Sequence, residues 1–149
     1  RYGNENATQE EMLHALKVAQ SDFVLTLPDG ICSHVAQGGT NFSGGQKQRL
    51  SIARALMKKA DLYIFDDSFS ALDFKTDAAL RKALEEETKN AAVLIIAQRI
   101  STILHAEQIV VLDDGKIVGI GTHDDLMEHC SVYRDIANSQ MKGGVKNGQ

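Results

Sequence analysis

The stretch NFSGGQKQRLSIARAL, residues 41–56, decides the fold. Its apolar positions recur at helical spacing, and Ser43 with Gln46 fits a capping box, so a helix should begin directly after Ser43. Gly44 and Gly45 nevertheless follow the cap, where each glycine costs a helix about 1 kcal/mol relative to alanine. Glycine pairs occur where another group approaches the backbone closely, and helix N-termini favour anions such as phosphate. The sequence therefore predicts a phosphate cradle at this helix start.

The remaining chain alternates between amphipathic helices and continuous apolar runs, which predicts an α/β protein with a buried parallel sheet. Asp113–Asp114–Gly115–Lys116 lies between two apolar runs and is a hairpin signal. The expected helices are 8–20, 43–59, 76–88, 124–129 and 132–138, and the expected strands are 62–65, 92–97, 109–112 and 117–120. The basic residues of the expected helix 43–59 should lie on its solvated side: Lys47, Arg49, Arg54, Lys58 and Lys59.

Polar residues follow two of the expected buried strands. Asp66 and Asp67 end the run LYIF, and Gln98 follows the run from Ala92 to Ala97. Ligands gather beyond the carboxyl ends of parallel strands, so these residues should face a ligand-binding edge. A carboxylate after a buried strand is where nucleotide-binding enzymes hold Mg²⁺, which makes Asp66 a candidate metal ligand.

Composition excludes several classes of protein. The chain has 149 residues, 43% of them apolar, and a formal net charge of −4, so it can form one compact domain but has no basic nucleic-acid footprint. Cys32 and Cys130 form no CxxC pair and predict neither a zinc site nor a disulfide framework. Its longest apolar run, Ala91 to Ala97, is far shorter than the about 20 residues of a membrane helix.

Five motifs in order, SGGQKQRLSIARAL, LYIFDD, SALD, LIIAQRIST and IVVLDDGKIVGIGTHDDLM, resemble the ATP-binding-cassette (ABC) ATPases, especially the nucleotide-binding domains of exporters. The resemblance covers nearly the whole chain. It implies a partial P-loop NTPase (RecA-like) parallel sheet with the ABC helical subdomain. The expected division is a helical and signature subdomain in 1–60, the C-terminal part of the RecA-like core in 61–139, and a disordered tail in 140–149.

The resemblance also implies roles for individual residues. Ser43, Gly44, Gly45 and Gln46 match the signature motif, which in the family binds the γ-phosphate of ATP held by the opposite subunit of a head-to-tail dimer. Asp66 matches the Walker B aspartate that holds Mg²⁺. Ser70 and Asp73 lie in SALD, which matches the D-loop that crosses the dimer interface. The implied cofactors are ATP and Mg²⁺.

Three departures from the family pattern matter. Asp67 stands where the family has a glutamate that polarises the attacking water, and its carboxylate is set back by roughly 1.5 Å. Gln98 replaces the switch histidine, and a glutamine cannot carry a proton between phosphate oxygens. The sequence has no Gly-x₄-Gly-Lys-Ser/Thr phosphate loop. We therefore expect a C-terminal fragment, without Walker A and Q-loop, that binds ATP poorly and does not hydrolyse it alone.

An intact signature beside a weak Walker B and switch resembles the degenerate half of a heterodimeric exporter. The expected partners are a second nucleotide-binding domain and transmembrane domains, without nucleic acid, at the cytoplasmic face of the cell membrane. One alternative is an ordinary homodimer that tolerates Asp67 and Gln98. Others are a soluble ABC ATPase acting on nucleic acid and a non-hydrolysing regulatory module.

Overall fold

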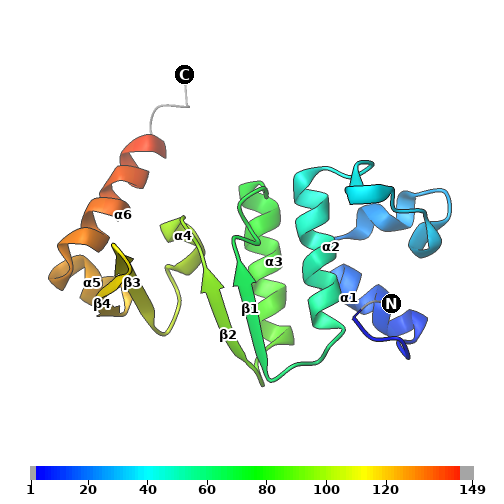
Figure 1. Cartoon of the computed structure of the whole chain (residues 1–149), viewed down its shortest axis with the longest axis horizontal. Coiled ribbons are helices and arrows are strands. Elements are labelled where there is room, and N and C mark those ends of the chain that lie inside the picture. The colour runs from blue at the N-terminus through cyan, green and yellow to red at the C-terminus, as the bar shows by residue number, and fades with distance from the viewer. Residues whose placement is uncertain (1–2, 145–149) are drawn as a thin grey trace. The chain divides into compact units, whose positions relative to one another are not determined.

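The computed structural model describes residues 3–144, and the chain forms two compact units, Arg1–Ile96 and Ala97–Gln149. The first unit contains α1 (Gln9–Val18), α2 (Gly44–Leu56), β1 (Leu62–Asp66), α3 (Phe74–Glu87) and β2 (Ala92–Ile96). The second contains α4 (Ile100–Ile103), β3 (Ile109–Asp113), β4 (Lys116–Gly121), α5 (His123–His129) and α6 (Ser131–Gly144) (Figure 1).

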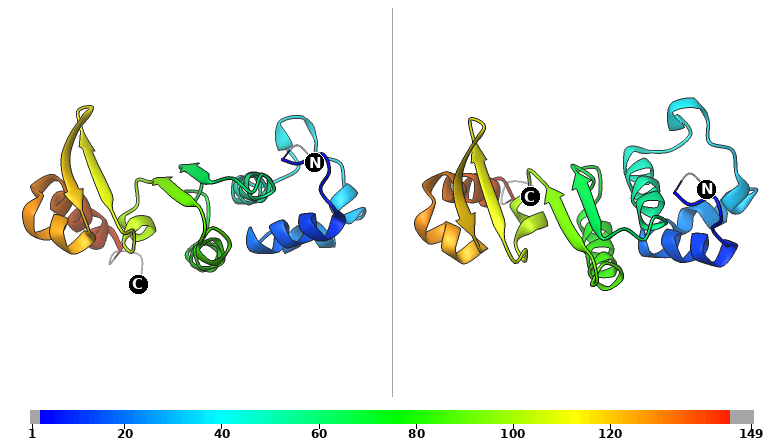
Figure 2. Two further views of the ribbon diagram at one scale, coloured as in Figure 1. Left: turned by 90° about the horizontal axis from the view of Figure 1, so that it is seen from below. Right: turned by 60° about the horizontal axis from the view of Figure 1, so that its bottom comes forward.

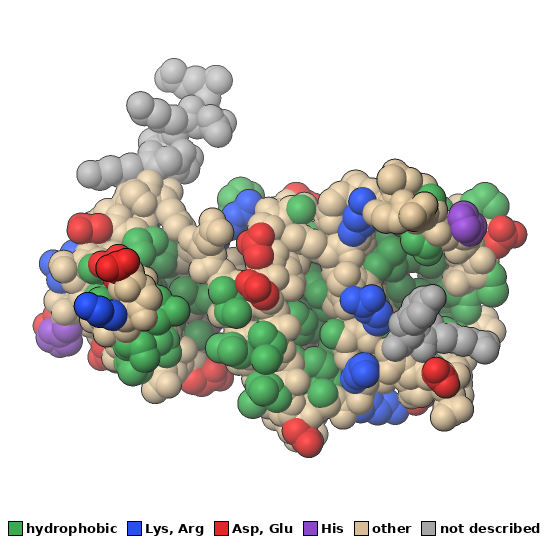
Figure 3. All heavy atoms as spheres, in the orientation of Figure 1, with side chains coloured by type: hydrophobic (Ala, Val, Ile, Leu, Met, Phe, Trp, Pro, Cys, Tyr) green, Lys and Arg blue, Asp and Glu red, His purple; other side chains and the backbone are tan. Residues whose placement is uncertain are grey.

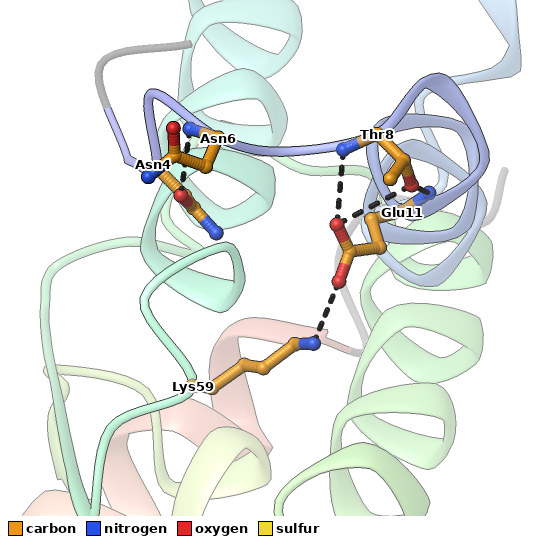
Figure 4. A network of polar contacts seen from close by, with 5 residues as sticks. All are labelled: Asn4, Asn6, Thr8, Glu11 and Lys59. Atoms are coloured by element: carbon orange, nitrogen blue, oxygen red, sulfur yellow. Dashed lines mark hydrogen bonds and ion pairs between the residues drawn. The ribbon is translucent and has the colours of Figure 1, made fainter.

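Helix α1 begins at a capping box. The Thr8 hydroxyl accepts the Glu11 N–H at 3.2 Å, and the Glu11 carboxylate accepts the Thr8 N–H at 3.0 Å. The other carboxylate oxygen of Glu11 accepts the Lys59 ammonium at 2.7 Å, so the residues after α2 are tied to the start of α1 (Figure 4). The hydrogen bond from Lys59 and that from the Thr8 N–H lower the pKa of Glu11 to about 2.

Strands β1 and β2 pair in parallel, as the apolar runs predict. Their register sets Tyr63 opposite Val93, Phe65 opposite Ile95 and Asp66 opposite Ile96, so both strands end at one edge. Helix α3 lies on one side of this pair (Figure 2). That side buries Tyr63 and Phe65 in a core shared with the three long helices, which includes Val18, Ala19, Ile52, Leu56, Leu80 and Leu84.

The opposite side of the β1–β2 pair is apolar and exposed. Ile64 is 59% exposed and its register partner Leu94 is 50% exposed, with Leu62 and Ile96 on the same side. Figure 3 shows hydrophobic side chains gathered over these strands. Parallel strands are normally buried on both faces, so it is unusual for a parallel pair to expose an apolar face to solvent.

Arg49 departs from the expectation that it lies on the solvated side of α2. Its guanidinium donates to the Gln20 carbonyl at 2.8 Å and lies 5.1 Å from the centre of the Phe23 ring. Phe23 lies in the short 3₁₀ helix Asp22–Thr26 that follows α1, and long cationic stems pack readily on aromatic faces. Arg49 therefore fastens α2 to the segment that follows α1.

The second unit is built on the predicted hairpin. β3 and β4 are antiparallel, and Asp114 and Gly115 both have positive φ, as a two-residue turn of this type requires. Helices α5 and α6 pack against it around Ile109, Val111, Leu126, Tyr133 and Ala137. Burial raises the pKa of Tyr133, whose hydroxyl lies 2.8 Å from His123 Nδ1.

The division into 1–60, 61–139 and a disordered tail stays a prediction. The compact units divide the chain after Ile96, whereas the predicted division groups residues by their role in the family. Of the predicted tail, residues 140–144 belong to α6, and 145–149 lie outside the described residues.

Candidate functional site

The site begins at the start of α2, where the predicted cap is present. Ser43 is the N-cap residue: its hydroxyl accepts the Gln46 N–H at 3.2 Å, and its own N–H donates to the Gln46 side chain at 2.8 Å. The first N–H groups of a helix lack intrahelical acceptors, which leaves those of Gly44 and Gly45 at the exposed end of α2. This end offers N–H donors, a hydroxyl and the positive end of the helix dipole, a combination that favours an anion.

Gly45 has a second reason to be glycine. A Cβ atom built on Gly45 lies 2.8 Å from the carbonyl oxygen of Ala71 and 3.4 Å from the Leu72 side chain. A Cβ on Gly44 meets only the Ala71 methyl, at an ordinary 3.5 Å. Gly45 thus lets the segment after β1 approach the start of α2, whereas Gly44 is not required for this approach.

Asp66 and Asp67 differ in their surroundings. Asp66 ends β1 and is exposed, so its carboxylate is free to meet a ligand from outside the chain. Asp67 has φ of +48°, a left-handed conformation that Asp tolerates better than most residues, and its N–H donates to the Ile96 carbonyl at 3.0 Å. The Asp67 carboxylate lies 3.0 Å from the Ser70 hydroxyl. It therefore bonds within its own turn.

Ser70 and Asp73 hold the next segment. The Ser70 hydroxyl lies within 3.1 Å of the Asp67 carbonyl as well as near its carboxylate. Asp73 is the N-cap of α3, and its carboxylate accepts the Thr76 N–H at 3.0 Å and the Thr76 hydroxyl at 2.7 Å. These two bonds, the backbone one foremost, lower the pKa of Asp73, so it is ionised at neutral pH.

Among residues 3–144, no group of three or more His, Cys, Asp or Glu side chains is placed to hold a metal ion. Mg²⁺ in nucleotide sites often takes one or two carboxylates, with phosphates and water as its other ligands. An exposed Asp66 fits that pattern as a single ligand.

Gln98 belongs to the second unit and is exposed, two residues after β2. The Gln98 backbone carbonyl accepts a hydrogen bond from the Gln140 side-chain amide nitrogen at 2.7 Å. The Gln140 side-chain oxygen accepts the Ile100 N–H at 2.9 Å. The Gln140 side chain, on α6, thus bonds to the backbone on both sides of Arg99. The residues predicted for the signature, Walker B and D-loop motifs all belong to the first unit.

Sequence reasoning missed Gln48. Its side chain bonds to Asp67, Ser70 and Ala71, and two of these residues, Asp67 and Ser70, were predicted site residues. The available signal was its spacing, because Gln48 follows Gly44 and Gly45 by four and three residues and so shares their face of the helix.

Comparison with known proteins gives consistent results. The family model described as ABC transporter matches residues 4–70. An uncharacterized ABC transporter ATP-binding protein of Mycobacterium tuberculosis is 47% identical over 152 residues, which span 99% of this chain and 26% of that protein. An ATP-dependent lipid A-core flippase of Francisella tularensis is 41% identical over 140 residues, which span 93% of this chain and 23% of that protein.

A solved structure, described as a bacterial Atm1-family ABC exporter with ATP bound, superposes with a TM-score of 0.90 at 35% identity. The superposition covers 94% of this chain and 25% of that chain, so the likeness extends through both units taken along the sequence. This chain spans about a quarter of the length of the curated relatives it matches. Its fold is the α/β fold of P-loop NTPases, and the chain belongs to the ABC transporter family.

Proposed function

We propose that this chain is part of the ATP-binding subunit of an ABC exporter, where ATP binding and hydrolysis drive transport across a membrane. The observation that carries the proposal is the capped, glycine-containing start of α2, with the segment from Asp66 to Asp73 packed on it. The exporter and flippase among the similar proteins support this choice of class.

Within that subunit, the start of α2 binds the γ-phosphate of ATP held by a second nucleotide-binding domain in a head-to-tail dimer. The Ser43 hydroxyl and the N–H groups of Gly44 and Gly45 suit this role because they supply donors without a competing side chain. Asp66 provides a carboxylate for Mg²⁺. When MgATP is bound, ATP supplies the phosphoryl group and Mg²⁺ supplies the positive charge that neutralises its oxygens. The residues of this chain orient the phosphoryl group and the metal ion.

The site that uses this chain's own Asp67 is the weaker one of the dimer. The Asp67 carboxylate is short and bonded to Ser70, and Gln98 cannot relay a proton, which supports a heterodimer with a competent partner site. The remaining partners are transmembrane domains, at the cytoplasmic face of the membrane, and the proposal includes no nucleic acid. Among residues 3–144, none of the helices has the length and apolar character needed to cross a bilayer.

Ser43→Arg, made in the protein that carries this chain, tests the role of the signature. The bulky side chain should fill the start of α2 and reduce ATP turnover at the partner site at least tenfold, since that site loses its γ-phosphate donors. Ser51→Arg, at an exposed position on the same helix, is the matched control. Equal turnover in the two variants would refute the proposed role.

A further inference from the structure

The side chain of Gln48 joins α2 to the turn that follows β1. Its amide nitrogen donates to the Asp67 carbonyl at 3.0 Å and lies 3.0 Å from the Ser70 hydroxyl oxygen. Its amide oxygen accepts the Ala71 N–H at 3.0 Å. Both ends of one partly buried side chain are therefore bonded to a segment about 20 residues away.

Gln48 shares a helix face with Gly45, which makes the second contact to the same turn. The Ala71 backbone donates its N–H to Gln48, and its carbonyl oxygen occupies the place where a Cβ of Gly45 would lie. One peptide segment is thus held at two points on successive turns of α2. Such a pair of contacts fixes orientation as well as distance.

The turn is also held by core packing and by one backbone bond: Phe69 is buried in the core, and the Asp67 N–H donates to the Ile96 carbonyl at 3.0 Å. Asp67 has φ of +48°, a conformation that persists only when the surroundings hold it. The Asp67 carbonyl receives Gln48, and the Asp67 carboxylate faces Ser70. Loss of the Gln48 amide would remove the side-chain hydrogen bonds from α2 to the turn and leave the close approach of Ala71 to Gly45 as the contact with α2.

We propose that Gln48 is a positioning residue that fixes the turn from Asp67 to Ala71 against the start of α2. The signature residues and the D-loop are then presented to the partner's nucleotide as one rigid piece. This inference rests on the proposed function, because it assigns Gln48 to the reaction of that same site. Gln48 itself does not touch the phosphate.

Gln48→Met, made in the complete protein that carries this chain, removes the bonds while keeping length and helix propensity. Amide hydrogen exchange followed by mass spectrometry, in peptides that contain Ala71, should be faster by about tenfold in this variant, since a bonded N–H becomes free. Gln9→Met, at an exposed position in α1, is the matched control and should exchange like the wild type in this region. Unchanged exchange around Ala71 in Gln48→Met overturns the proposal.

Steady-state ATP hydrolysis supplies the functional readout. Displacing a catalytic group by about 1 Å can cost on the order of 10²-fold, so kcat in Gln48→Met should fall at least tenfold while KM for ATP and the melting temperature match those of Gln9→Met. Faster exchange with unchanged kcat also overturns the proposal.

Gln48→Glu keeps an acceptor for the Ala71 N–H but has no donor for the Asp67 carbonyl. It should show nearly normal exchange at Ala71 and a reduced kcat, and this result decides the matter if Gln48→Met does not fold. A normal kcat in Gln48→Glu overturns the proposal. These turnover measurements use the wild-type protein and its variants assembled with the partner nucleotide-binding domain. If that assembled wild-type protein hydrolyses no ATP, the proposed function fails, and the exchange rates still decide whether Gln48 holds the turn.

Discussion

The carbonyl oxygen of Ala71 lies 2.8 Å from the position that a Cβ atom of Gly45 would occupy. A real Cβ does not approach a backbone oxygen so closely, so the backbone of α2 or of the segment that contains Ala71 would have to move to admit a methyl group. The contact gives Gly45 a structural reason to be glycine, independently of any phosphate.

Gly45→Ala should lower the free energy of unfolding by about 1–3 kcal/mol, because added volume in a packed contact forces backbone shifts. Gly44→Ala is the control. Its Cβ would meet the Ala71 methyl at 3.5 Å, so it should be neutral or stabilising by up to about 1 kcal/mol. Denaturant unfolding of both variants measures the difference. Equal stabilities would show that the contact is relieved without strain.

Asp67→Glu combined with Gln98→His should raise ATP hydrolysis by the protein that carries this chain, purified without a partner, by about tenfold or more. The longer carboxylate reaches further toward the water, and the imidazole can carry a proton. Phosphate release measures turnover, with Asp61→Glu and Gln9→His as a control pair at exposed positions. Robust wild-type turnover that neither substitution increases would favour an ordinary homodimer.

Glu11 should make the stability of the fold depend on pH in the acidic range. Its pKa is held at about 2, against an ordinary 4.5, by Lys59 and the Thr8 N–H, so the folded state favours the ionised form. This contribution to stability is present above about pH 4.5 and is lost as the pH falls toward 2. Glu11→Gln should therefore lower the melting temperature near pH 6 and have little effect near pH 2.

Glu10→Gln, in the same helical turn, is the control for that experiment, and high salt should reduce the Glu11 effect because Lys59 is largely exposed. A difference between wild type and Glu11→Gln that stays constant from pH 6 to pH 2 would contradict the assignment.

The chain of 149 residues, produced by itself, should associate through the apolar side of β1 and β2. Ile64 and Leu94 are adjacent on this side and at least half exposed. Ile64→Glu with Leu94→Glu should reduce the mass measured by light scattering, because buried charges oppose association. Asn90→Glu with Asn138→Glu adds the same charge elsewhere and should not. A wild-type monomer at high concentration would contradict this prediction.

Local sequence was sufficient for most of the long elements, but it missed the short helix α4 (Ile100–Ile103) and the length of α6, which was predicted to end at 138 and extends to Gly144. The Ser43–Gln46 box starts α2 as predicted, and the Asp114–Gly115 pair forms the turn of the hairpin. Continuous apolar runs alternating with amphipathic helices correctly predicted that β1 and β2 are parallel. The cap and the turn depend on neighbours within a few residues, so their physical causes are visible in the sequence.

Contacts between distant residues were decided by the tertiary structure. Gln48 reaches Asp67, Arg49 reaches Gln20, and Gln140 reaches Gln98, over separations of 19, 29 and 42 residues. A polar side chain on a helix can face water or a partner with the same local pattern, and packing determines which. The sequence by itself therefore determined the cap, the strands and the family motifs. Only the fold decided that Gly45 and Gln48 contact Ala71, because these contacts exist only once α2 and the segment after β1 are packed together.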